Sequence, residues 1–468
     1  MNNPLDTTLV DSAIRFAVDA HSGTERRGKG FPYIIHPLEA MEIVATITND
    51  PEMLAAAVLH DTVEDTDVTT EDIRKIFGER VSRLVVSDTS DSTLGWRERR
   101  RGVMDRLARS AWEDKVVAIG DKLSNLRAVY RDYKQGGESF WSRFHAPNGK
   151  ADYEWYYREL GWALIDLSET EAYREYMDLL EKTFGKEISA PHQIDIREYE
   201  ESGAGYNAVS YNYRYGKTMV KMYREGVDRA VPEQELRQSR NVRSLGLNTP
   251  LAGRLVWDGK RYGAEFVRVE GKRSFARAIS QNPEDMTLYA ERFAYLCKEL
   301  HNTPCSQNDF ESEVDFYHRI INQNTDYSAS EKQRLHEFVN QVPVEYTCIH
   351  GDLHIGNILT ANGKDFWIDL GDFRWGNHWF DLGMLYFVCK CWREEPVFEL
   401  FHISKDQMAQ VWDVFARIYF STDAPGTLSE IERKVRPFAA LKLLHLRSLG
   451  LHYPEGDDMI RKELLGEL

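Results

Sequence analysis

The sequence predicts two domains, an all-α domain followed by an α+β domain. Its 468 residues are too many for one ordinary hydrophobic core, and the length favours roughly two to three domains. Up to about residue 185 the apolar residues recur at helical spacing, whereas from Ile194 onward alternating runs and turns appear. We therefore expect a first domain at 1–185, a linker at 186–193 and a second domain at 194–468.

The composition excludes several classes of function. A hydrophobic content of 42% suits globular domains, and the net charge of −16 argues against broad nucleic-acid binding. No apolar run reaches about 18 residues, so we expect no membrane span. The five cysteines form no C-x-x-C pair and no disulfide framework, which favours reduced thiols and a cytoplasmic location. The oligomeric state cannot be read from these features.

The first predicted helix runs from Val10 to His21, and a basic loop follows it. Arg26, Arg27 and Lys29 lie between glycines in this loop. Such a cluster suits an anionic ligand, although a solvated charged turn explains the charge equally well. His36 then begins a helix expected over 38–47, where a lone histidine is most often structural.

The segment from Leu59 to Thr66 concentrates polar side chains at the end of an alanine-rich run that favours helix. If the helix continues, His60 and Glu64 lie four residues apart, and so do Asp61 and Asp65. Carboxylates this close repel one another unless a cation lies among them, so a bound metal is one explanation. A solvated acidic helix end is the alternative.

A later helix, expected over 112–131, supplies a further carboxylate, Asp121, at the end of an apolar run. Together with His36, His60 and Asp61 it makes a mixed nitrogen and oxygen ligand set, which suits Mn, Fe or Zn. A last helix, expected over 169–184, closes the domain, with Gly185 as its C-cap.

The first third of the chain resembles the HD-superfamily metal phosphohydrolases. More narrowly, it is similar to the RelA/SpoT-type hydrolases and their small single-domain relatives, which remove the 3′-pyrophosphate of (p)ppGpp. The resemblance rests on Arg26-Arg27, Pro32 to Pro37, His60 to Thr66, Phe77-Gly78, Thr89 and Asp121 to Arg127.

This resemblance implies a role for each matching residue. Mn²⁺ would be held by His36, His60, Asp61 and Asp121. Glu64 and Asp65 would orient or deprotonate the attacking water. The nucleotide substrate would be bound by Arg26, Arg27 and Asn125.

The second domain opens with a glycine-rich turn, expected over 202–210, between strand-like runs. Lys221 lies in the strand that follows, expected over 218–223. Glycine amides and a strand lysine can bind phosphates, although glycine turns are also common in plain hairpins. Glu235, on a helix expected over 232–245, could form an ion pair with Lys221. Glu233 is the alternative partner.

The segment from Ile349 to Asp372 reads as a loop, a strand, an Asn362-Gly363 turn and a second strand. This arrangement brings Asp352, Asn357 and Asp369 to one edge of a small hairpin. Phosphoryl transfer needs a carboxylate facing the acceptor hydroxyl and oxygen ligands for Mg²⁺, and these three residues supply them.

From about Ile194 to its end the chain resembles the aminoglycoside/choline-kinase-like phosphotransferases, a branch of the protein-kinase-like fold. The resemblance implies a bilobal α+β domain, with an N-lobe at 194–271 and a helical C-lobe at 272–468. Asp352 would be the catalytic base, and Asn357 and Asp369 the Mg²⁺ ligands. The residues expected to bind ATP are Ser202, Gly203, Gly205, Lys221 and Glu235.

Three functional hypotheses follow. The chain could be a bifunctional enzyme that hydrolyses a (p)ppGpp-like nucleotide and phosphorylates a hydroxyl of an unknown acceptor. Alternatively, the first domain could reverse the modification that the second makes. In the third hypothesis the first domain is a nucleotide sensor that regulates a kinase.

Overall fold

The computed structural model describes residues 7–26, 30–86, 95–143, 146–185, 191–205, 207–451 and 453–466. Apart from the short segment 213–217, the chain divides into two compact units between Ala190 and Pro191. Each unit buries apolar residues of its own. Among the described residues, no helix combines the length and the apolarity that a membrane span requires.

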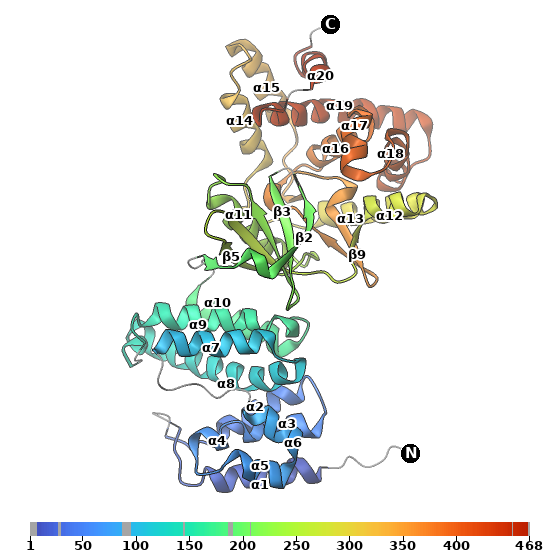
Figure 1. The fold of residues 1–468 in the computed structure, drawn as a ribbon. Helices are drawn as coiled ribbons and strands as arrows, with labels where there is room; N and C mark the ends of the chain where they lie inside the picture. The colour runs from blue at the N-terminus through green and yellow to red at the C-terminus, as the bar shows by residue number, and fades with distance from the viewer. Residues whose placement is uncertain are drawn as a thin grey trace. The chain divides into compact units, whose positions relative to one another are not determined.

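The regular elements of the first unit are helices (Figure 1). In chain order they are α1 (Thr8–Ala20), α2 (Ile35–Ala45), α3 (Pro51–Leu59), α4 (Thr62–Asp65), α5 (Thr70–Phe77), α6 (Glu79–Val86), α7 (Trp96–Arg109), α8 (Trp112–Gly136), α9 (Lys150–Ala163) and α10 (Glu171–Phe184). The all-α first domain expected from the sequence is confirmed.

Helix α8 is the central element of this unit. It is 25 residues long, buries an almost continuous stretch from Asp114 to Ser124, and packs against α2, α3 and α10. Gly120 permits the close contact with α2, because a Cβ atom there would lie only 2.6 Å from the Ala40 carbonyl oxygen. This contact places Asp121, the next residue, beside the start of α2.

The condition that one helix continues through His60 and Asp61 is not met. Helix α3 ends at Leu59, and the short α4 begins at Thr62. The Thr62 hydroxyl donates a 2.7 Å hydrogen bond to the Leu59 carbonyl, and such bonds compete with the helical pattern of the backbone. Asp65 N–H still donates to the Asp61 carbonyl at 2.9 Å, so the two acidic residues stay one turn apart.

The other predicted helices of this unit are present with shifted ends. Helix α2 begins before His36, which is therefore inside the first turn, and α8 extends to Gly136. The C-cap expected at Gly185 is confirmed, because this residue has φ of 90° directly after α10.

The second unit combines sheets with helices. Its strands are β1 (His192–Gln193), β2 (Tyr199–Ala204), β3 (Ala208–Tyr213), β4 (Thr218–Tyr223), β5 (Ala252–Trp257), β6 (Tyr262–Val267), β7 (Arg273–Ser274), β8 (Thr347–Ile349), β9 (Ile358–Ala361), β10 (Lys364–Trp367) and β11 (Arg374–Gly376). Its helices are α11 (Ala230–Ser244), α12 (Phe275–Gln281), α13 (Met286–Asn302), α14 (Glu313–Gln323), α15 (Ala329–Gln341), α16 (Trp379–Tyr386), α17 (Glu394–Phe401), α18 (Lys405–Phe420), α19 (Pro425–Ser448) and α20 (Pro454–Leu464).

This unit has a sheet lobe and a helical lobe (Figure 1). The six-stranded sheet has the order β1-β5-β6-β4-β3-β2, and α11 packs against β5 and β6. Strand β1 pairs with β5 in parallel, so His192 and Gln193 of the expected linker take part in this sheet. In the helical lobe, α16 packs on α19 and α13 packs on α18.

A small hairpin lies beside the helical lobe. Strands β9 and β10 are antiparallel, and the turn between them has positive φ at Asn362 (50°) and Gly363 (75°). These angles are typical of a tight two-residue hairpin turn, which asparagine and glycine favour. The predicted hairpin is confirmed, and Asn357 and Asp369 lie on its two flanks.

Candidate active sites

Three side chains converge in the first unit. His36 from α2, His60 from the end of α3 and Asp121 from α8 have ligand atoms that all lie within 4.8 Å of one another. His36 Nε2 is 3.1 Å from Asp121 Oδ1, and His60 Nε2 is 3.6 Å from the same oxygen. Asp61 adjoins them, with its Oδ2 2.9 Å from His60 Nε2 and 3.5 Å from His36 Nε2. The structure thus brings together all four predicted ligands.

Hydrogen bonds orient both imidazole rings toward this cluster. Ser124 Oγ donates to Glu39 Oε2 at 2.7 Å and therefore accepts from His36 Nδ1, also at 2.7 Å. His60 Nδ1 donates to the Ala57 carbonyl at 2.8 Å. Anchoring the Nδ1 atoms in this way leaves the Nε2 lone pairs for a metal, as in many metal sites.

The donor set fits a divalent cation. His60 Nε2 is buried and has no hydrogen-bond partner of acceptable geometry within the described residues. Two imidazole nitrogens and two carboxylates suit Mn, Fe or Zn. The residues that would hold the ion are His36, His60, Asp61 and Asp121.

The electrostatics of the cluster favour a bound positive charge. Burial opposes charge on the His60 imidazole, but Asp61 and Asp121 outweigh it and raise the pKa of His60 well above its usual value. Burial also opposes charge on the Asp61 carboxyl, yet His60 holds the pKa of Asp61 down at about 2. Lys122, His36 and His60 likewise keep the pKa of Asp121 well below its usual value against the effect of burial.

The predicted nucleotide-binding residues lie beside the cluster. Arg26 Nη2 donates to Asn125 Oδ1 at 2.6 Å, and Asn125 Nδ2 donates to Asp121 Oδ1 at 2.5 Å. Glu64 and Asp65 are exposed on α4, one turn beyond Asp61. Arg27, and Thr89 of the resemblance, lie outside the described residues.

Sequence reasoning missed two residues that line this site. The Tyr33 hydroxyl donates to Asp61 Oδ2 at 2.7 Å, and burial together with Asp61 raises the pKa of this phenol. The His21 ring lies 4.9 Å from the Tyr33 ring. Helical periodicity placed His21 only at the end of a helix, and no spacing signal links Tyr33 to a carboxylate 28 residues later.

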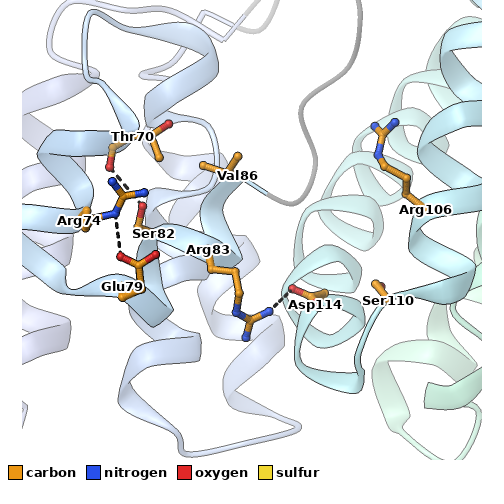
Figure 2. A pocket seen from close by; sticks show the side chains of 9 residues that line it. All are labelled: Thr70, Arg74, Glu79, Ser82, Arg83, Val86, Arg106, Ser110 and Asp114. Atoms are coloured by element: carbon orange, nitrogen blue, oxygen red, sulfur yellow. Dashed lines mark hydrogen bonds and ion pairs between the residues drawn. The ribbon is translucent and has the colours of Figure 1, made fainter.

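A separate hollow of about 480 Å³ lies elsewhere in the first unit (Figure 2). It is lined by Thr70, Arg74, Glu79, Ser82, Arg83, Val86, Arg106, Ser110 and Asp114. Arg74 pairs with Glu79 at 2.7 Å, and Arg83 pairs with Asp114 at 3.0 Å. Of the predicted site residues that the structure describes, none lines this hollow.

In the second unit a lysine joins two acidic residues. Lys221 Nζ on β4 lies 2.8 Å from Glu235 Oε1 on α11 and 2.5 Å from Asp369 Oδ1. Burial disfavours its charge, but the two carboxylates raise the pKa of Lys221 well above its usual value. Glu233 pairs instead with Arg229 at 2.6 Å. Glu235, rather than Glu233, is therefore the ion-pair partner of Lys221.

The loop that carries Asp352 is held by Asp381. The backbone N–H groups of His350 and Gly351 donate to Asp381 Oδ2 and Oδ1 at 2.6 Å and 2.8 Å. Asn357 Nδ2 donates to the Asp352 carbonyl at 2.9 Å. These bonds fix Asp352 and Asn357 relative to one another.

Lys442, on α19, is a site residue that the sequence did not indicate. Its Nζ donates to the Gly351 carbonyl at 2.9 Å and lies 3.6 Å from Asp352 Oδ1. Burial opposes ionisation of Asp352, but Lys442 and His354 hold the pKa of this carboxyl well below its usual value. Lys442 lies 91 residues from Gly351, so only the fold reveals the contact.

The predicted phosphate-covering turn is shorter than expected. Ser202 and Gly203 lie within β2, and Ser202 Oγ donates to the Ser210 carbonyl at 3.2 Å. Gly205 N–H donates to the Ala208 carbonyl at 2.8 Å and closes the turn. Within the described residues, Ser202, Gly203 and Gly205 make no hydrogen bond or ion pair with Lys221.

The fold and these two sites define a chain with an HD domain followed by a domain of the phosphotransferase class. The family described as "HD domain" matches residues 13–144, and the family described as "Phosphotransferase enzyme family" matches residues 204–414.

Curated relatives specify the first domain further. Guanosine-3′,5′-bis(diphosphate) 3′-pyrophosphohydrolase MESH1 of Danio rerio is 36% identical over 138 residues, which cover 29% of this chain and 76% of the relative. The Homo sapiens protein of the same name is 41% identical over 128 residues, covering 26% and 71%. Through its HD domain, the chain belongs to this pyrophosphohydrolase family.

The second domain is similar to solved kinase structures. ADP-bound aminoglycoside phosphotransferase APH(2'')-Ib is 14% identical, and the match covers 58% of this chain and 93% of that one with a TM-score of 0.38.

Proposed function

We propose that the first unit hydrolyses the 3′-pyrophosphate of a (p)ppGpp-like nucleotide with the aid of Mn²⁺. The observation that carries this proposal is the convergence of His36, His60 and Asp121, with Asp61 beside them. The pyrophosphohydrolase names of the relatives support the choice of substrate. A bound Mn²⁺ would lower the pKa of a water ligand and so supply a nucleophile near neutral pH.

The protein's own residues then have distinct tasks. Glu64 and Asp65 orient the attacking water and accept its proton, because they lie one turn beyond Asp61. Arg26 and Arg27 bind the nucleotide by stacking or by pairing with phosphate. Asn125 bonds both Arg26 and Asp121, so it ties the nucleotide-binding loop to the ligand cluster.

The test is to incubate ppGpp with the protein and Mn²⁺ and to follow loss of the 3′-pyrophosphate by mass spectrometry. We expect turnover by the wild type and a loss of at least 100-fold in Asp61→Ala. Arg74→Ala, in the separate hollow of Figure 2, is the control and should retain full activity. The hydrolase proposal is wrong if ppGpp stays intact with the wild type, or if Asp61→Ala hydrolyses it equally well.

We also propose that the second unit transfers the γ-phosphate of ATP to a hydroxyl group of a small or macromolecular acceptor. The carrying observation is the Glu235–Lys221–Asp369 arrangement beside the Asp352 loop. Lys221 binds phosphates of ATP, and Glu235 positions it. Asn357 and Asp369 would hold Mg²⁺ through their side-chain oxygen atoms, and the ion would neutralise charge on the phosphates. Asp352 accepts the proton of the acceptor hydroxyl, and the stretch containing Ser202, Gly203 and Gly205 covers the phosphates.

An untargeted screen tests the transferase. The protein is incubated with ATP, Mg²⁺ and a metabolite extract, and new phosphorylated species are sought by mass spectrometry. Products should form with the wild type and be lost with Asp352→Asn, since the variant lacks the carboxylate that accepts the proton. If Asp352→Asn forms the products at the wild-type rate, Asp352 is not the residue that accepts the proton.

A further inference from the structure

His21 is a buried histidine with no hydrogen-bond partner at either ring nitrogen among the described residues. Only 3% of its surface is exposed, and it lies directly after α1. Burying a polar group without a partner costs free energy, because its hydrogen bonds to water are lost and not replaced. Such groups are therefore rare in native proteins. The other two histidines near the cluster, His36 and His60, both have an anchored Nδ1 atom.

The His21 ring belongs to the surroundings of the hydrolytic site. It lies 4.9 Å from the ring of Tyr33, whose hydroxyl donates to Asp61. Burial lowers the pKa of His21, while the charges of Asp61 and Asp65 act on the ring in the opposite direction. The ring is thus linked to the ligand cluster through Tyr33, which contacts both His21 and Asp61.

We propose that His21 is a substrate-contacting residue, and that its ring N–H donates a hydrogen bond to an oxygen of the substrate's pyrophosphate group. This inference rests on the proposed hydrolase function and adds to it the chemical group that His21 recognises. A histidine ring carries at least one N–H in either protonation state. Asp61, whose charge acts on the His21 ring, already accepts from Tyr33, whereas a pyrophosphate brings several acceptor oxygens.

Binding of inorganic pyrophosphate to the full chain with Mn²⁺, measured by calorimetry, tests this contact. We expect His21→Leu, which keeps the side-chain volume but loses the donor, to weaken pyrophosphate binding about 10-fold or more. His21→Asn retains an N–H donor and should recover part of the loss. Mn²⁺ binding without pyrophosphate should match the wild type in both variants, and circular dichroism checks that each variant folds.

Three results overturn the inference. Unchanged pyrophosphate affinity in both variants shows that His21 does not contact this group, even if ppGpp turnover falls because a bound water is lost. An equal loss of Mn²⁺ affinity shows that His21 supports the ligand cluster instead. If both variants fold and His21→Asn binds pyrophosphate no better than His21→Leu, the proposed hydrogen bond from His21 does not exist.

Hydrolysis of ppGpp, followed in parallel, separates the two proposals. A wild type that binds pyrophosphate through His21 yet leaves ppGpp intact refutes the proposed substrate and leaves this contact standing.

Discussion

At the scale of single residues, the hydroxyl of Ser124 links the ligand cluster to the rest of the first unit. It accepts from His36 and donates to Glu39, which also accepts from Arg127 at 3.2 Å. Removing the hydroxyl frees the His36 ring to turn away from Asp121. Partners of this kind commonly contribute 10- to 100-fold to metal affinity.

Ser124→Ala should therefore weaken Mn²⁺ binding about 10- to 100-fold while the fold remains intact. Isothermal calorimetry with Mn²⁺ measures this directly, and thermal unfolding checks the fold. Ser142→Ala is the matched control, because the Ser142 hydroxyl is exposed and donates to the nearby Ser139 carbonyl, far from the ligand cluster in sequence. Equal Mn²⁺ affinity in Ser124→Ala and the wild type would show that His36 is oriented by packing alone.

A second residue, Glu313 of the second unit, should make the stability of that unit depend on pH. It is 2% exposed, and burial raises its pKa to about 7 although Arg374 lies 3.3 Å away. The folded state keeps this proton up to about pH 7, whereas the unfolded chain releases it near pH 4.5. The unfolded state thus binds fewer protons between these values, and stability falls as the pH rises through this window.

Glu313→Gln removes the ionisation, so it should stabilise the second unit at pH 8 by up to about 3 kcal/mol. At pH 5 the difference should nearly disappear, because most of Glu313 then keeps its proton in the folded state. Urea unfolding of both proteins at the two pH values measures the change. Exposed Glu337→Gln serves as the control, and a Glu313→Gln protein that is less stable at pH 8 would contradict the prediction.

The site residues that could be predicted from the sequence lie close together in the chain, whereas those that could not be predicted lie far apart in it. His60, Asp61, Glu64 and Asp65 stand within one short segment, so their spacing alone suggested a shared site. Lys442 comes near Asp352 only because α19 packs on α16, and no local pattern encodes that packing. Predicted roles such as those of Glu64 and Asn125 remain predictions until their variants are assayed.

At the scale of secondary structure, the contact between α2 and α8 determines where His36 and Asp121 meet. Gly120 lies at this contact, where an added Cβ atom would be 2.6 Å from the Ala40 carbonyl oxygen and 2.9 Å from Val44 Cγ2. Both neighbours belong to α2, which also carries His36. The helices cannot approach as closely with any other residue at this position.

Gly120→Ala should therefore destabilise the first unit by about 1–3 kcal/mol, the usual cost of overpacking, and weaken Mn²⁺ binding as Asp121 moves away. Gly102→Ala on α7 is the control, because its Cβ atom would meet only the flexible Arg106 guanidinium at 3.6 Å. Alanine is the better helix former, so that control should be neutral or slightly stabilising. Thermal unfolding and Mn²⁺ titration of both variants test the prediction. If Gly120→Ala is as stable as Gly102→Ala, α8 can shift away from α2 at little cost in free energy.

Element boundaries were predictable where local chemistry sets them. Strand β4 occupies the predicted residues, and the Asn362-Gly363 turn has the backbone angles that its residue types favour. The break after Leu59 was not predictable from propensity, because alanine-rich sequence favours helix and the interruption depends on hydroxyl bonds formed in the fold. The turn near Gly205 was misjudged in length for a similar reason, since β2 and β3 extend into it.

At the scale of the whole molecule, each proposed site draws its residues from one unit only. The hydrolase residues come from α1 to α8, and the transferase residues come from β2 onward. The second unit also has a hydrophobic core of its own, extending from Val242 to Leu465. The order of a helical domain and an α+β domain was predictable because periodicity changes along the chain. The kinase acceptor was not, since no motif records which surfaces of the helical lobe bind it.

Because the two residue sets share no member, inactivating one site should leave the other working. We expect Asp352→Asn to hydrolyse ppGpp at the wild-type rate within about twofold, and Asp61→Ala to retain the wild-type rate of ATP-dependent phosphorylation. Both rates are measured on the full chain, with Mn²⁺ and Mg²⁺ present together. The double variant should lose both activities, which excludes a contaminating enzyme as their source. A single variant that changes both rates several-fold would show that the sites are coupled, and would favour the hypothesis in which one domain senses a nucleotide and regulates the other.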